Sequence, residues 1–124
     1  MYEEKIDINK SEVKTLMEEK DYFQDLQERL LELIALPIPK DKYNSVENLI
    51  FRYTAELREK ALKETKEEAI NLEFKHYVKN ILSIIETLIS GDQYKALRRL
   101  LQNEIYACAI VVIQSKMDKA DASS

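Results

Sequence analysis

The only histidine of the chain, His76, is the first residue to test for chemistry. It follows Glu73 by three residues, a spacing that places both side chains on one helix face in carboxylate-bridged di-metal bundles. Such a centre needs two of these motifs and two further glutamates, so only a symmetric dimer could complete it here. Leu72 and Lys75 beside the pair indicate no apolar pocket. We therefore favour a surface histidine, predict no metal and no cofactor, and rank a dimeric metal-binding enzyme third among the hypotheses.

The only cysteine, Cys108, lies in an apolar run over residues 105–113 with no cationic residue in it. A reactive thiolate needs a nearby base or positive charge, and His76 belongs to a different predicted helix. One cysteine and one histidine also fall short of the three or four ligands of a zinc site. The sequence therefore predicts an inert core thiol and a protein that is not an enzyme. A single cysteine allows no internal disulfide, so we expect a reducing, cytoplasmic setting.

The densest basic cluster consists of Lys95, Arg98 and Arg99, with Tyr94 beside it. Cations next to an aromatic ring can bind phosphates and stack a base. The chain as a whole carries a formal charge of -4, so it lacks the bulk positive charge that drives non-specific nucleic-acid binding. We favour a solvated helix face here, and we keep a small nucleic-acid-binding subunit of a ribonucleoprotein or DNA-processing complex as the second hypothesis.

Glycine and proline, the residues that break regular structure, are scarce: one Gly and two Pro in 124 residues. A chain with so few turn residues must consist of a few long elements. Apolar residues at three- and four-residue steps identify these elements as helices. The first predicted helix begins at the Asn9 cap, with Glu12 in capping-box position, and it ends near Leu36 because Pro37 and Pro39 follow.

Three more helices follow in the prediction. The second covers residues 46–63, with N-cap oxygens offered by Asp41, Asn44 and Ser45. The third ends near residue 89, and the patterns leave open whether it continues the second without a break or begins at a new cap formed by Thr65 and Glu68. The only glycine turn, at residues 90–92, then separates it from the last helix.

The last helix is apolar on all sides in its second half. Such a segment is either deeply buried or pressed against another chain. We give equal weight to a helix in the middle of the bundle and to a contact with a protein partner or a second copy. The predicted interface residues are Tyr106, Ile110, Val111, Val112 and Ile113.

Together these elements predict an all-α, up-and-down bundle of four antiparallel helices, within limits of three to five. Residues 1–117 form a single helical-bundle domain in this prediction, and residues 118–124 form a disordered polar tail. No run of about 18 apolar residues is present, so we expect no membrane partner. The leading hypothesis is a helical interaction or assembly subunit of an intracellular complex, with no chemistry of its own.

One stretch of the sequence resembles a known family. Leu36-Pro37-Ile38-Pro39-Lys40-Asp41-Lys42-Tyr43 resembles the Leu-Pro-x-Asp-Phe-Tyr approach to the second helix in archaeal subunits of the GINS replication complex. The charged helix, the Glu-rich middle and Lys79-Asn80-Ile81-Leu82 extend the similarity over residues 36–105. The third helix departs from the family, because Ile89-Ser90-Gly91-Asp92 stands where members carry a basic stretch. The resemblance implies a non-enzymatic scaffold in DNA replication that holds the replicative helicase in its active form.

Overall fold

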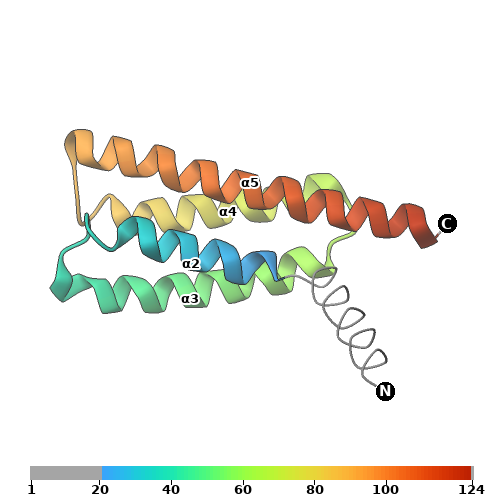
Figure 1. Cartoon of the computed structure of the whole chain (residues 1–124), viewed down its shortest axis with the longest axis horizontal. Helices are drawn as coiled ribbons and strands as arrows, with labels where there is room; N and C mark the ends of the chain where they lie inside the picture. The colour runs from blue at the N-terminus through green and yellow to red at the C-terminus, as the bar shows by residue number, and fades with distance from the viewer. Residues whose placement is uncertain (1–20, 124) are drawn as a thin grey trace, which may run out of the picture.

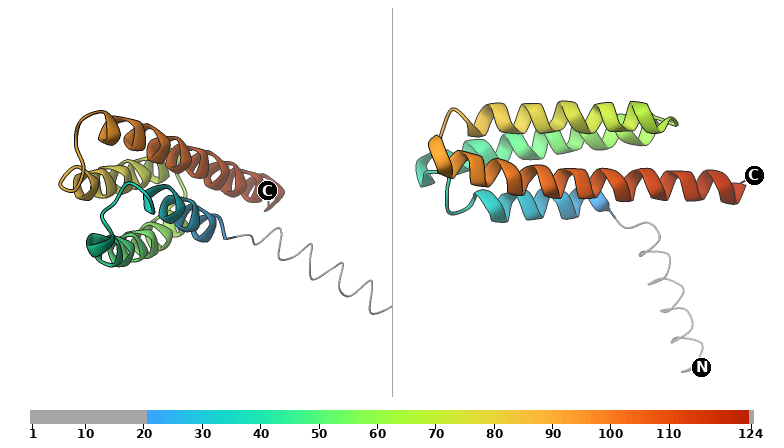
Figure 2. Two further views of the ribbon diagram at one scale, coloured as in Figure 1. Left: turned by 60° about the vertical axis from the view of Figure 1, so that its left-hand side comes forward. Right: turned by 90° about the horizontal axis from the view of Figure 1, so that it is seen from above.

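The computed structural model describes residues 21–123, and these form four helices and no strand. The helices are α2 (Tyr22–Ile34), α3 (Lys40–Lys63), α4 (Glu67–Ile85) and α5 (Gly91–Ser123) (Figure 1). Successive helices run antiparallel, and α5 returns to pack against α2 (Figure 2). The predicted all-α, up-and-down bundle of four helices is confirmed. The predicted Asn9 cap lies outside the described residues.

The first described helix begins at its own cap. The Asp21 carboxylate accepts a hydrogen bond of 3.0 Å from the backbone N–H of Gln24, and the Asp21 backbone is not helical (φ -85°, ψ 89°). The prediction of a helix that continues unbroken through Asp21 to Leu36 is therefore wrong at Asp21, where a capping carboxylate begins α2. α2 then ends at Ile34, because Pro37 and Pro39 follow closely.

α3 begins directly after Pro39, several residues earlier than predicted. Pro39 itself occupies the cap position without a side-chain hydrogen bond, and its carbonyl accepts from the backbone N–H groups of Lys42 and Tyr43. The predicted caps Asp41, Asn44 and Ser45 lie within the helix. The fixed φ of proline favours a helical start, which explains why none of these side chains is needed as a cap.

α3 and α4 are separate helices, which settles the question that the sequence left open. The break lies at residues 64–66, where Glu64 and Lys66 adopt extended backbone angles. The cap of α4 is Lys66, with no side-chain hydrogen bond, so the predicted Thr65–Glu68 cap is wrong. The free carbonyl groups at the C-terminus of α3 are bonded by a lysine of α5. Lys116 Nζ donates to the carbonyl oxygens of Ala61 (2.9 Å), Leu62 (2.8 Å) and Glu64. A cation at a helix C-terminus is favourable for the helix dipole.

α4 ends at Ile85, before the predicted residue 89, and the chain turns through residues 86–90. Gly91 has a φ of 64°, in the left-handed region that glycine enters without strain. α5 then stays helical through Ser123, across residues that the sequence assigned to a disordered polar tail. No Gly or Pro follows Gly91, and the Gln114 amide donates to the Asp118 carboxylate at 2.9 Å, so nothing local ends the helix earlier.

The core lies between all four helices. Phe23 of α2 stacks with Phe74 of α4 across the bundle, with ring centroids 6.1 Å apart. One polar pair is buried among these apolar side chains: Thr54 of α3 donates its hydroxyl proton to the Ile50 carbonyl (2.6 Å). Its oxygen lies 2.7 Å from the Tyr77 hydroxyl, and because Thr54 has only one proton, Tyr77 is the donor.

Candidate interaction surface on α5

The last helix has two apolar faces, and only one of them belongs to the core. The inner face repeats at three- and four-residue steps and is buried: Leu97, Leu101, Ile105, Ala109 and Val112. The outer face carries large apolar side chains that remain exposed: Leu100, Tyr106, Ile110 and Val111. We call these four residues the outer patch. A helix that needs only one face for its bundle thus presents a second apolar face to its surroundings.

The five predicted interface residues divide between these faces. Ile110 is 68% exposed, Val111 41% and Tyr106 43%, as an interface position requires. Val112 is 3% exposed and belongs to the core, and Ile113 packs partly buried against it. Neighbouring side chains on a helix point about 100° apart. Val111 is therefore exposed although the next residue, Val112, is buried.

Sequence reasoning missed Leu100 as a member of the outer patch. Leu100 is exposed, and it shares a helix face with Ala107 and Ile110, which lie seven and ten residues further on. That spacing was readable from the sequence. Which of the two apolar faces would point outward was not readable, because it depends on where α2 and α4 pack.

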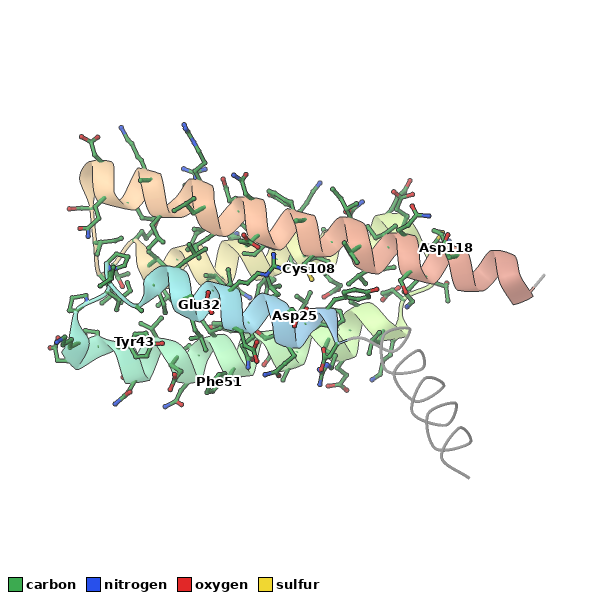
Figure 3. All side chains as sticks on the ribbon, viewed as in Figure 1. Asp25, Glu32, Tyr43, Phe51, Cys108 and Asp118 are labelled. Atoms are coloured by element: carbon green, nitrogen blue, oxygen red, sulfur yellow. The ribbon has the colours of Figure 1, made fainter. Side chains whose placement is uncertain are left out.

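A hollow of about 280 Å³ opens along the seam between α2 and α5. Its wall on α2 consists of Tyr22, Asp25, Leu26 and Arg29, and its wall on α5 of Glu104, Ala107, Cys108 and Val111. Figure 3 labels one residue of each wall, Asp25 and Cys108. The guanidinium of Arg29 pairs with the Glu104 carboxylate across the seam, at 3.1 Å. No pattern in the sequence predicts this hollow, because its two walls are about eighty residues apart in the chain.

Cys108 lies half-buried in the wall of this hollow, and its Sγ contacts the Tyr22 carbonyl oxygen at 3.6 Å. The pKa of the Cys108 thiol is raised to about 12, chiefly by burial and also by the neighbouring Asp25 carboxylate, while Arg29 acts in the opposite direction. The thiol is therefore protonated near neutral pH and is a poor nucleophile.

No protein-family model, curated protein or solved structure matches the chain. The resemblance of residues 36–105 to GINS subunits stays a prediction from the sequence. Among the described residues, no helix is both long enough and apolar enough to cross a bilayer.

Glu73 and His76 line a shallow depression between α3 and α4, and His76 is exposed. Within residues 21–118, nowhere do three or more His, Cys, Asp or Glu side chains gather as a metal site requires. The structure therefore adds no further ligands to the Glu73–His76 pair from its own chain.

The basic cluster lies near the start of α5, away from the hollow. Lys95, Arg98 and Arg99 are all exposed, and Tyr94 is partly buried against the core. No salt bridge within the described residues involves these three cations. Their charge is available to an anionic partner, whereas the Tyr94 ring packs in part against the core.

Proposed function

We propose that this protein is a non-enzymatic helical interaction subunit that binds another protein chain through the outer patch of α5. One observation carries the proposal: Tyr106, Ile110 and Val111 are exposed although the four-helix core is complete without them. Contiguous apolar side chains on a surface mark interaction sites, whereas scattered single ones do not. In the outer patch they lie within three turns of one helix.

The energetic reason is the cost of leaving these side chains in water. Burying a large aliphatic side chain contributes about 1.5 to 3 kcal/mol, and Ile110 has most of that contribution still available. Asn103 and Gln114 are exposed polar residues on the same face. An apolar centre with polar groups at its edge is the usual anatomy of a protein–protein interface.

The test compares Ile110→Asp with Gln114→Asp, which changes an exposed residue one turn further along α5. Light scattering at several concentrations measures self-association, and quantitative pull-down with the tagged chain measures binding of other proteins. We expect Ile110→Asp to remove the association and Gln114→Asp to reduce it less. If a stably folded Ile110→Asp protein keeps its oligomeric state and all of its partners, the proposal is wrong.

A scaffold in DNA replication is the specific form of this proposal that the GINS resemblance supports. The resemblance covers residues 36–105, which span α3, α4 and the first half of α5. In this form, the proteins lost from the pull-down of Ile110→Asp are replication proteins. Loss of a set with no replication protein in it would contradict the GINS form and leave the interaction subunit intact.

Nucleic-acid binding is a second candidate function. It is favoured by the exposed cations Lys95, Arg98 and Arg99, which form no salt bridge within the described part of the chain. Fluorescence anisotropy with single-stranded DNA and RNA at several salt concentrations tests it directly. Binding should weaken steeply with salt and should be lost when Arg98 and Arg99 are both changed to alanine. No binding at low salt would exclude this function.

A further inference from the structure

We propose that the partner of the outer patch is a second copy of this chain, whose α5 lies antiparallel to α5 of the first copy across a two-fold axis. The axis passes between residues 108 and 109, on the side of α5 that faces away from the bundle. This inference rests on the proposed function, because it names the protein chain that the outer patch binds.

The open side of α5 fixes where this axis passes. Within the described residues, α5 packs against α2 and α4 on its inner side, and no helix lies on its far side (Figure 1, Figure 2). Ala109 is buried in the core and Cys108 lies half-buried beside it, so the point on α5 opposite these two residues faces outward. The exposed side chains of Ala107, Ile110 and Gln114 surround that point. A two-fold axis through it brings the same open face of two copies together.

An axis at this position makes the outer face of α5 complementary to itself. Residues that lie equally far from the axis, one before it and one after it, face each other across a two-fold interface. With this alignment, apolar side chains face apolar side chains, and amides face amides. The facing pairs, each formed twice, are Ala107 with Ile110, Tyr106 with Val111, Asn103 with Gln114, and Leu100 with Met117.

Charges at the two ends of this face are complementary as well. Arg99 is exposed, and no salt bridge within the described residues involves it. Asp118, labelled on the C-terminal part of α5 in Figure 3, is also exposed. It accepts a hydrogen bond of 2.9 Å from the Gln114 amide and forms no salt bridge in the described part of the chain. Arg99 and Asp118 lie equally far from the axis, so each arginine faces the aspartate of the other copy.

Other arrangements of two α5 helices bring like charges together. A parallel pair in the same alignment would place Arg99 beside Arg99. A slide of two turns that moves the axis toward the N-terminus of α5 would place Asp118 beside Asp92, which is exposed too. Like charges that face each other across an interface are unfavourable, so the charge pattern favours the antiparallel arrangement with its axis between residues 108 and 109.

Arg99 and Asp118 of one chain cannot reach each other. Nineteen residues separate them, which is about 28 Å along a helix, whereas the atoms of an ion pair lie within about 4 Å. Rescue of one substitution by the other therefore reports a contact between two copies.

Charge reversal in the full-length chain tests this contact. Arg99→Asp and Asp118→Arg each replace two attractions per dimer with two repulsions, and the double variant restores both attractions with the charges exchanged. Light scattering at several concentrations and low salt measures the dissociation constant of the dimer. We expect each single variant to raise it at least tenfold and the double variant to return it to within threefold of the wild type. Arg98→Asp is the matched control: the same charge change on a side chain about 150° from the axis should alter the constant less than threefold.

A monomer at every concentration would overturn the inference. If Ile110→Asp still removed other proteins from the pull-down in that case, the proposed function would stand, with a different protein on the outer patch. A dimer that both single variants leave unchanged, or that the double variant fails to restore, would overturn the antiparallel arrangement.

A crosslink tests the same arrangement without any change of charge. Asn103→Cys with Gln114→Cys, in a Cys108→Ala chain, places thiols of two copies face to face. Within one chain these positions are about 16 Å apart along the helix, too far for a disulfide. After equilibration in a glutathione redox buffer, non-reducing electrophoresis should show most of this protein as a disulfide-linked dimer. The control, Asn103→Cys alone in the Cys108→Ala chain, should form at least fivefold less, and equal yields would overturn the inference.

Discussion

The two long sides of the bundle are held together in different ways. Between α3 and α4, Thr54 and Tyr77 form a hydrogen bond that is buried in the core. Between α2 and α5, the corresponding polar contact is the Arg29–Glu104 ion pair, which is exposed to solvent beside an open hollow. A buried, fully satisfied polar pair fixes one packing arrangement, whereas an exposed ion pair contributes little. The polar contact between α3 and α4 therefore fixes their packing, whereas the polar contact between α2 and α5 contributes little and lies beside open space.

The largest expected effect contrasts two neighbouring valines of α5. Val112→Asp puts a charge into the core, where Val112 is 3% exposed, and it should cost more than about 4 kcal/mol or abolish folding. Val111→Asp faces the hollow and should cost less than about 1 kcal/mol. Urea unfolding followed by circular dichroism measures both. Similar losses in the two variants would contradict the two-faced description of α5.

The buried hydroxyl pair gives the next largest effect. Thr54→Val leaves the Tyr77 hydroxyl buried without a partner and should destabilise the fold by about 1 to 3 kcal/mol. Tyr77→Phe leaves Thr54 bonded to the Ile50 carbonyl, so it should cost about 1 kcal/mol. The double variant should be more stable than the sum of the two losses predicts, and simple additivity would show that the hydrogen bond carries no coupling.

Alkaline pH should weaken the α2–α5 side through Cys108. The pKa of this thiol is raised to about 12 in the folded chain, mainly by burial, and it is about 8.5 in an unfolded chain. The folded state thus holds the proton longer, so the contribution is complete below about pH 8.5 and is lost as the pH rises toward 12.

Between pH 9 and pH 11 this linkage should cost about 1 to 3 kcal/mol. Thermal unfolding of the wild type and of Cys108→Ala across this range measures it, and the variant should have the flatter profile. Tyr77, whose pKa burial also raises, acts in the same direction above about pH 10 in both proteins, and the two differ only in the interaction of Tyr77 with the Cys108 thiolate. If the stability of the wild type and of Cys108→Ala fell equally with pH, the raised pKa of Cys108 would not be the cause.

The smallest effect is expected at the ion pair across the seam. Arg29 is exposed, and solvent and salt screen its attraction to Glu104. Arg29→Ala and Glu104→Ala should therefore leave the unfolding midpoint unchanged within error at physiological salt. A clear loss in both would show that the seam depends on this pair and would remove the contrast with the α3–α4 side.

Much of the fold was readable from local patterns. The scarcity of Gly and Pro and the apolar stripes predicted four antiparallel helices, because each helix must bury one face. Helix ends were predicted less well. Asp21 lies inside a continuous apolar stripe that hides its role as a cap, and Pro39 begins α3 without a side-chain cap, ahead of the capping side chains Asp41, Asn44 and Ser45. The apolar second half of the last helix left burial and exposure of Ile110 equally weighted in the prediction, and the structure exposes it. The separation of Val111 from Val112, and the hollow itself, depend on how α2 docks on α5, and no local pattern encodes that.

Lys116 has a consequence for the order in which the chain assembles. Its ammonium group donates to three carbonyl oxygens at the end of α3, those of Ala61, Leu62 and Glu64, which lie more than fifty residues earlier. These carbonyls converge only after α3 has ended, and a slide of α5 by one residue would rotate Lys116 away by about 100°. The contact can therefore form only when α3, α4 and α5 are all present and correctly aligned. It stabilises the complete bundle and not partly folded states.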